Sequence, residues 1–188
     1  MKRREAIAGA ASLGVLGAGG ALAVGGFPSF GSSSDGSNEN PQIDEPVTVP
    51  TVDLSWSDGE PVTVPIADTV TVLEFWATTC TVCPDAVPKV TAAAERTGDD
   101  VAFVAITAED VGPDDFSPEY IEDTWREFGG GEWPIGYGTF EVQVQLTSAA
   151  TPATAIIDAD GVTQWTHTGI VSTETILEEI EAAGGTVR

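Results

Sequence analysis

The order of apolar and polar residues predicts several strands and helices in the first half of the folded region. Residues 47–66 alternate between the two types on both sides of Asp58-Gly59, which predicts two strands joined by a tight turn at that pair. Residues 69–77 and 99–107 are largely apolar and favour buried strands. Between them, apolar residues recur at helical spacing up to Gly98, so we expect a strand, a helix and a parallel strand.

The second half of the folded region continues this alternation. Residues 117–131 predict a helix with Ser117 as its cap, and its expected buried side consists of Tyr120, Ile121, Trp125 and Phe128. Residues 153–158 and 162–168 predict two strands around a turn, and residues 172–185 predict a capped C-terminal helix. The order predicts an α/β domain, in which helices flank a central mixed sheet and an N-terminal β-hairpin precedes it.

The N-terminal segment differs from the rest of the chain. Basic residues precede 21 uncharged positions in residues 1–26, the pattern of an export signal or a membrane anchor. The consecutive Arg3 and Arg4 before a glycine-rich apolar segment resemble a twin-arginine signal, and Ala21-Leu22-Ala23 offers a cleavage site. Because 21 helical residues at about 1.5 Å each also span a bilayer, an uncleaved anchor is the alternative. Either interpretation predicts that the protein works outside the cytoplasm, secreted or anchored to the outer face of the cytoplasmic membrane.

Residues 27–46 are poor in large apolar side chains and rich in Ser, Gly, Asn and Pro. This composition predicts a flexible linker, because such a segment buries too little apolar surface to offset the entropy of ordering. The folded domain is therefore expected to span residues 47–188.

The charge balance excludes one class of partner. Seven Lys and Arg against 30 Asp and Glu give a formal net charge of −23. Nucleic acid is not expected to bind, since affinity for a polyanion depends on basic residues that neutralise phosphates. Because 41% of the chain is still hydrophobic, we interpret the acids as a solvated coat on a folded domain, as in halophilic proteins.

The only two cysteines, Cys80 and Cys83, are separated by two residues. Such a pair in a chain of 188 residues is not a disulfide framework and points to redox or metal chemistry. Cys80 follows a predicted strand and precedes a predicted helix, where free N–H groups and the helix dipole stabilise a thiolate. Cys83, one turn further, is within disulfide reach and can resolve a mixed disulfide. Pro84 disfavours helical geometry at Cys83, so the helix is expected to start late.

These residues resemble the thioredoxin superfamily, and most closely the TlpA-like branch of exported thiol-disulfide oxidoreductases. The family pattern of a strand, W-A-x-x-C-x-x-C and a later helix proline is matched by Trp76, Ala77, Cys80, Cys83 and Pro88. A second family motif, a cis-proline before the last strand pair, is matched by Pro152 with Thr151 before it. The resemblance implies a thioredoxin-like fold across residues 47–183.

The resemblance also implies roles for individual residues. Glu74 would move the proton of the second thiol; the simpler interpretation is a strand acid that reaches solvent. Pro152 would face the disulfide, and Trp76 and Thr151 would help to position a substrate; Trp76 is alternatively a core aromatic and Pro152 an ordinary loop proline. His167, the only histidine, is expected on the surface of the last strand.

The function predicted from this resemblance is disulfide exchange with exported client proteins. Cytochrome c maturation is one task of such proteins, and a membrane electron donor or acceptor would be a second partner. No cofactor is expected. Two alternatives are a copper carrier that uses Cys80, Cys83 and His167, and a thiol peroxidase in which Cys80 attacks peroxide.

Overall fold

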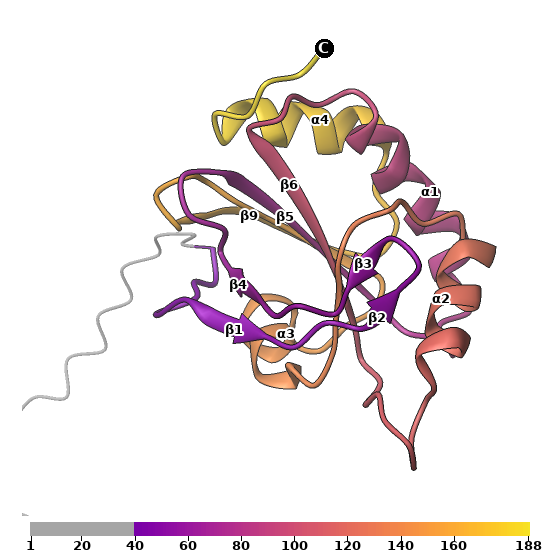
Figure 1. Ribbon diagram of the computed structural model, residues 1–188. Coiled ribbons are helices and arrows are strands. Elements are labelled where there is room, and N and C mark those ends of the chain that lie inside the picture. Colours follow the sequence, from indigo (N-terminus) through magenta and orange to yellow (C-terminus); the bar gives the residue numbers. More distant parts are fainter. Residues whose placement is uncertain (1–39) are drawn as a thin grey trace, which may run out of the picture. The chain divides into compact units, whose positions relative to one another are not determined.

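A computed structural model describes residues 40–188, which form a mixed five-stranded sheet in the order β7-β6-β5-β8-β9 (Figure 1). Strand β6 runs parallel to β5 and β7 parallel to β6, whereas β8 and β9 run antiparallel to their neighbours. The predicted central mixed sheet is therefore confirmed. The bounds of its strands are β5 Val70–Trp76, β6 Val101–Thr107, β7 Ile135–Gly136, β8 Ala153–Ile157 and β9 Thr163–Thr168.

Four helices flank this sheet, and the alternation of side chains along β5 shows which helix covers which face. Val72 packs in a buried cluster with residues of α1 and α4, and Trp76 in one with residues of α1 and α2. Leu73 points the other way, into a cluster with residues of α3. Three helices thus cover one face and α3 helps to cover the other. Their bounds are α1 Cys83–Ala94, α2 Pro118–Glu127, α3 Phe140–Thr147 and α4 Thr173–Ala182.

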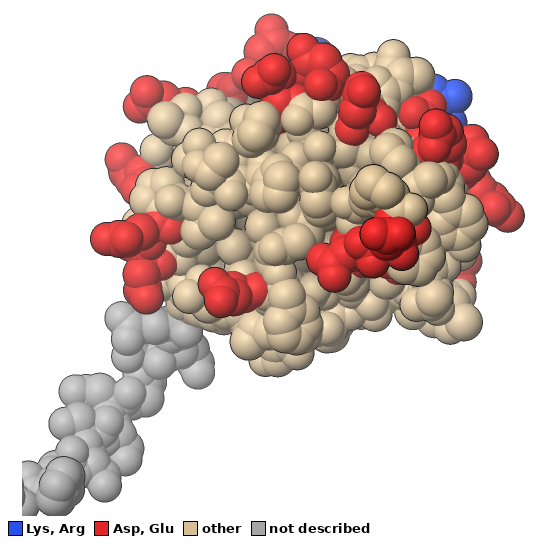
Figure 2. Space-filling view, turned by 60° about the horizontal axis from the view of Figure 1, so that its bottom comes forward, with Lys and Arg blue, Asp and Glu red and all other residues tan. Residues whose placement is uncertain are grey.

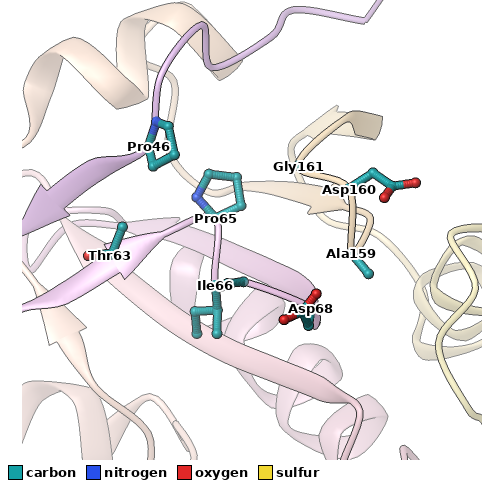
Figure 3. A pocket seen from close by; sticks show the side chains of 9 residues that line it. Pro46, Thr63, Pro65, Ile66, Asp68, Ala159, Asp160 and Gly161 are labelled. Carbon is teal, nitrogen blue, oxygen red and sulfur yellow. The ribbon is translucent and has the colours of Figure 1, made fainter.

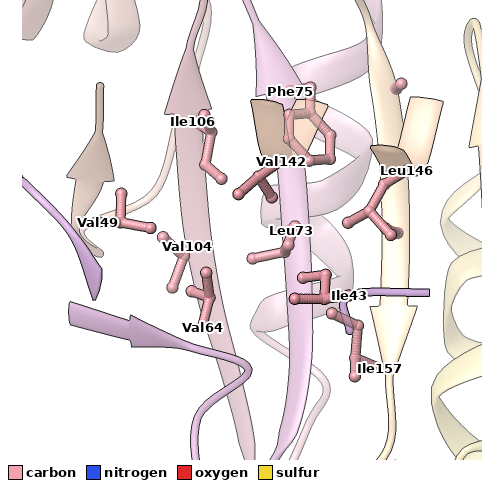
Figure 4. Close-up of a cluster of buried hydrophobic side chains, with 12 residues drawn as sticks. Ile43, Val49, Val64, Leu73, Phe75, Val104, Ile106, Val142, Leu146 and Ile157 are labelled. Carbon is pink, nitrogen blue, oxygen red and sulfur yellow. The ribbon is translucent and has the colours of Figure 1, made fainter. Parts of the chain in front are cut away.

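All seven residues of β5 are buried, which explains why this segment is rich in β-branched and aromatic residues. Its Leu73 and Phe75 belong to a cluster beneath β1, β4 and α3 (Figure 4). Fully burying an apolar side chain of this size contributes about 1.5–3 kcal/mol to the stability of the fold. The burial of β5 therefore stabilises the sheet.

The N-terminal strands pair as predicted, but their turn lies elsewhere. Strand β1, Val47–Val49, pairs antiparallel with β4, Val62–Val64, and a smaller pair of β2, Asp53–Leu54, with β3, Ser57–Asp58, lies between them in the chain. The turn falls at Ser55-Trp56, so the expected turn at Asp58-Gly59 was wrong. Tertiary contacts hold it there: the Trp56 indole N–H donates to the Trp133 carbonyl at 2.9 Å, and the Ser55 amide to Glu122 at 2.9 Å.

Two residues of the predicted α2 core stripe are not fully buried: Phe128 is partly buried and Tyr120 is exposed. Ile121 and Trp125 are inaccessible to solvent, as expected. Tyr120, in contrast, is 50% exposed, so its assignment to the core was wrong. It lies beside the stripe in the first turn of α2, and its ring stacks on Phe116 of the preceding loop, with centroids 5.6 Å apart.

Strand β7 and helix α3 were not predicted. The sequence of α3, FEVQVQLT, alternates apolar and polar residues as a strand would. It is nevertheless helical because Val142 and Leu146, four residues apart, pack together into the cluster on the face of β5 that carries Leu73.

The packed chain begins earlier than Val47. Ile43, which composition assigned to the linker, is only 8% exposed and belongs to the cluster around Leu73. The Gln42 side chain accepts from the Thr163 amide at 2.8 Å and donates to the Thr163 carbonyl at 3.1 Å. The predicted signal or anchor and most of the linker lie outside the described residues. Within residues 40–188, no helix is both long enough and apolar enough to cross a membrane.

Candidate active site

Cys80 and Cys83 are joined by a disulfide bond, with their Cα atoms 5.4 Å apart. Strand β5 ends at Trp76, and the chain turns so that the Cys80 amide donates to the Ala77 carbonyl at 3.1 Å. Helix α1 then begins at Cys83 itself, with Pro84 in its first turn where a missing N–H costs little. Cys83 is therefore part of the helix, so Pro84 does not exclude it, and the expectation of a later start was wrong.

The two sulfurs differ in access to solvent. Cys83 is completely buried and packs with Trp76 and Val87, whereas Cys80 is partly exposed. An approaching thiol or disulfide therefore reaches Cys80 first. Val82, the N-cap residue of α1, offers no side-chain acceptor to the helix, so the helix dipole is left to favour negative charge on the segment before it.

Glu74 is a buried acid without a partner. It is 1% exposed, and neither carboxyl oxygen has a hydrogen-bond partner among residues 40–188. Burial raises the pKa of Glu74 well above its usual range. The interpretation of a strand acid that reaches solvent was therefore wrong. Glu74 lies on the same face of β5 as Trp76, which packs against Cys83.

Pro152 follows a cis peptide bond from Thr151, as predicted. Strand β8 runs antiparallel to β5 with Ala153 opposite Phe75. Continuing this register places Thr151 and Pro152 beside the residues that lead from β5 to Cys80. The two separated sequence motifs therefore meet at one edge of the sheet.

Three solved structures have a fold similar to that of this chain, and each match covers most of the chain. StoA from Bacillus subtilis is 18% identical with a TM-score of 0.58, covering 74% of this chain and 98% of its own. The exposed lipoprotein thioredoxin Etrx1 from Streptococcus pneumoniae is 18% identical with a TM-score of 0.59, and the match covers 73% of this chain and 99% of Etrx1. A secreted Mycobacterium tuberculosis disulfide oxidoreductase homologous to E. coli DsbE is 18% identical with a TM-score of 0.54, and the match covers 72% of this chain and 95% of that protein. The chain has a thioredoxin-like fold. No protein-family model and no curated protein matches the sequence.

Trp76 occupies the interior of this thioredoxin-like domain. It is completely buried, and its ring centroid lies 5.0 Å from that of Trp125 and 5.9 Å from that of Phe128. Its place behind Cys83 matches the alternative of a core aromatic. A role in positioning substrate stays a prediction, and such a role would act through Cys83 and not through direct contact.

His167 is a partly buried residue of β9, with its ring 5.5 Å from that of Trp165. Its cross-strand neighbour is Thr154 of β8, which in turn lies opposite Glu74, so one strand separates His167 from β5 at that level. In the described part of the chain, no three His, Cys, Asp or Glu side chains are grouped to hold a metal ion.

One residue beside the cysteines was missed by the sequence analysis. Glu109 was included in the solvated coat of acids, yet it is only 8% exposed. One of its oxygens accepts from the Thr78 amide at 2.7 Å and the Thr78 hydroxyl at 2.8 Å, and the other accepts from the Thr107 hydroxyl. A signal was present: parallel strands end at one edge of a sheet, so an acid two residues after β6 lies near the end of β5.

Two hollows of the domain lie at opposite ends of the sheet. One, of 330 Å³, lies between the residues that precede β5 and the turn between β8 and β9, away from the cysteines (Figure 3). The other, of 430 Å³, lies beside Cys80 and is called the Thr79 hollow. It is lined by Ala77, Thr79, Ala108, Glu109, Asp110, Asp115 and Phe116.

Acidic side chains are spread over the face of the molecule shown in Figure 2, and basic ones appear only at its margin. This distribution fits the large excess of Asp and Glu in the sequence. It gives no continuous basic surface on that face for a polyanion to contact.

Proposed function

We propose that the protein is an extracytoplasmic thiol-disulfide oxidoreductase of the TlpA-like kind. The observation that carries this proposal is the unequal exposure of one bonded pair, an accessible Cys80 and a buried Cys83. A nucleophile needs access, whereas the resolving thiol needs protection from competing partners.

The exchange proceeds in two steps. A client thiolate attacks the Cys80 sulfur, the bond between Cys80 and Cys83 breaks, and Cys83 leaves as a thiolate. A second client thiolate then attacks the client sulfur of this mixed disulfide and releases Cys80 as a thiolate. Two electrons pass from the client to the cysteine pair, and the client gains a disulfide. The reverse sequence reduces a client disulfide.

Glu74 supplies the proton that this exchange requires at Cys83. Because burial raises its pKa, Glu74 holds a proton where exposed acids have lost theirs, and it donates that proton to the departing Cys83 thiolate. In the reverse direction the Glu74 carboxylate takes the proton back. Its place on the face of β5 that also carries Trp76, behind Cys83, supports this role.

Thr151 and Pro152 are proposed to position the client. They lie at the sheet edge where the cysteine loop begins, so an extended client segment that reaches Cys80 passes beside them. Trp76 keeps water away from Cys83 from the inner side.

The proposed setting is the outer side of the cytoplasmic membrane, with exported proteins as clients and a membrane electron donor or acceptor as the redox partner. The N-terminal sequence supports export, and two of the similar structures are those of an exposed lipoprotein and a secreted oxidoreductase. Cytochrome c maturation is one process that such exchange serves.

The test is a redox titration against glutathione with alkylation resolved by mass. The wild type should convert between a dithiol and a disulfide in one two-electron step. Cys83→Ser should accumulate a mixed disulfide at Cys80 with a cysteine-containing peptide, and Cys80→Ser, the matched control, should accumulate far less because Cys83 is buried. Equal trapping by both variants, or tight Cu(I) binding without any exchange, would overturn the proposal.

A further inference from the structure

Glu109 connects two segments that meet beside the cysteines. It follows β6 by two residues, and its carboxylate accepts both the amide and the hydroxyl of Thr78, two residues before Cys80. A third donor, the Thr107 hydroxyl, holds the other oxygen. The backbone of this junction is fixed as well, because the Ala108 amide donates to the Trp76 carbonyl at 3.0 Å.

These contacts make Glu109 different from its acidic neighbours. Asp110 and Asp115 line the same Thr79 hollow, but within residues 40–188 their side chains make no hydrogen bond to the cysteine loop. The other acids near the cysteines are Asp85, exposed in the first turn of α1, and the buried Glu74 of β5; the nearest base along α1 is Lys89. Among residues 40–188, only Glu109 brings a buried carboxylate into direct contact with the segment that enters Cys80.

A carboxylate in this place has two effects on the first cysteine. By accepting two Thr78 donors it restricts the backbone that carries Cys80, as charge-assisted hydrogen bonds do. Its negative charge also opposes ionisation of a nearby thiol, since a like charge disfavours the charged form. The first effect fixes the position of the Cys80 sulfur, and the second limits the fraction of Cys80 that is ionised.

We propose that Glu109 is a positioning residue for Cys80, which holds the loop before the sulfur and moderates its acidity. This inference rests on the proposed function of the cysteine pair. It concerns the free reduced protein, so it is measured without any client.

The first measurement is the pH dependence of Cys80 alkylation in the full reduced chain. Glu109→Gln keeps an oxygen acceptor for Thr78 and removes the charge, so the midpoint for Cys80 should fall by roughly one pH unit. The equilibrium with glutathione should move severalfold toward the dithiol, because a stabilised thiolate stabilises the reduced form. Asp110→Asn, which removes a charge from the same hollow without touching Thr78, is the matched control and should shift the midpoint by less than about a third as much.

The second measurement is amide hydrogen exchange at Thr78. Glu109→Ala removes both charge and acceptor and should speed exchange of the Thr78 amide at least about tenfold, whereas Glu109→Gln should leave it within about threefold of the wild type. Should Glu109→Ala fail to fold, Glu109→Gln alone still decides the effect on acidity.

Two results would overturn the inference: an unchanged Cys80 midpoint in Glu109→Gln, or an equal shift in Asp110→Asn. Failure of the proposed function would look different. The wild type would then exchange no disulfide with the peptide, while the Cys80 midpoint of Glu109→Gln would still be displaced.

Discussion

At the scale of single residues, Glu74 is the side chain whose environment departs most from its ordinary one. It lies on the central strand without a hydrogen-bond partner among residues 40–188, and burial raises its pKa. The folded protein therefore keeps a proton that the unfolded chain releases. Stability falls as pH rises from the unfolded pKa of a glutamate, about 4.3, through the raised folded value.

Glu74→Gln should remove this pH dependence. At pH 4 the variant and the wild type should unfold at similar urea concentrations, because both side chains are neutral. At pH 8 the variant should be the more stable, by about 1.4 kcal/mol for each unit by which burial raises the pKa. Urea unfolding between these pH values measures the difference. Glu127→Gln, at an exposed position of α2, is the control, and a Glu74 variant that is less stable at pH 8 would contradict the expectation.

Glu74→Gln should also slow the exchange reaction, since Gln cannot deliver a proton to Cys83. We expect about 10²-fold slower release of Cys83 at neutral pH, the lower range for loss of a general acid. Stopped-flow measurement of the reaction between the oxidised protein and a small dithiol tests this. A rate that stays within about twofold of the wild type across the pH range would remove Glu74 from the mechanism.

At the scale of elements, the end of α2 depends on a glycine. The Trp125 indole N–H donates to the Gly131 carbonyl at 2.9 Å, and the chain after α2 passes directly over this ring. A Cβ atom on Gly130 would lie 2.0 Å from the Trp125 Cε2 atom. Because Trp125 is fully buried among aromatic rings, it has no room to withdraw.

Gly130→Ala should therefore destabilise the domain by about 1–3 kcal/mol through overpacking. The urea midpoint should fall with an unchanged slope. Gly112→Ala serves as the matched control, because its Cβ would meet no atom closer than 3.6 Å and should change stability by less than about 0.5 kcal/mol. Equal urea midpoints for the two variants would contradict this expectation and would show that the Trp125 ring can move to accommodate the added methyl group.

At the scale of the whole molecule, the acidic excess sets the response to salt. Repulsion among 30 acids, offset by only seven bases, destabilises the compact state, and this repulsion weakens as the screening length falls from about 10 Å at 0.1 M salt to about 3 Å at 1 M. The halophilic interpretation makes the same prediction.

The midpoint of thermal unfolding should therefore rise by several degrees or more between about 0.1 M and 2 M NaCl at pH 7. At pH 4, where many carboxylates are neutralised, the gain should be smaller, which serves as the control for non-electrostatic effects of salt. A melting temperature that does not change with salt at pH 7 would contradict both the repulsion argument and the halophilic interpretation.

The sequence by itself determined the sheet strands with strong apolar runs, three of the four helices of residues 40–188, the pairing of Cys80 with Cys83 and the cis-proline Pro152. These features depend on local patterns: a run of largely apolar residues for β5, capping residues for α2 and α4, and the spacing of two cysteines. Such signals come from residues that are close together in the chain, so they can be recognised from the sequence alone.

The tertiary structure alone decided the features that depend on contacts distant in sequence. Helix α3 has the alternation of a strand, and the turn at Ser55-Trp56 is held by residues of α2 and of the segment before β7. Cys83 is buried because it packs with Trp76 and Val87, and Glu109 reaches Thr78 because parallel β5 and β6 end at the same edge. The energy of these contacts comes from burial and from hydrogen bonds across the fold, and no local sequence pattern encodes it.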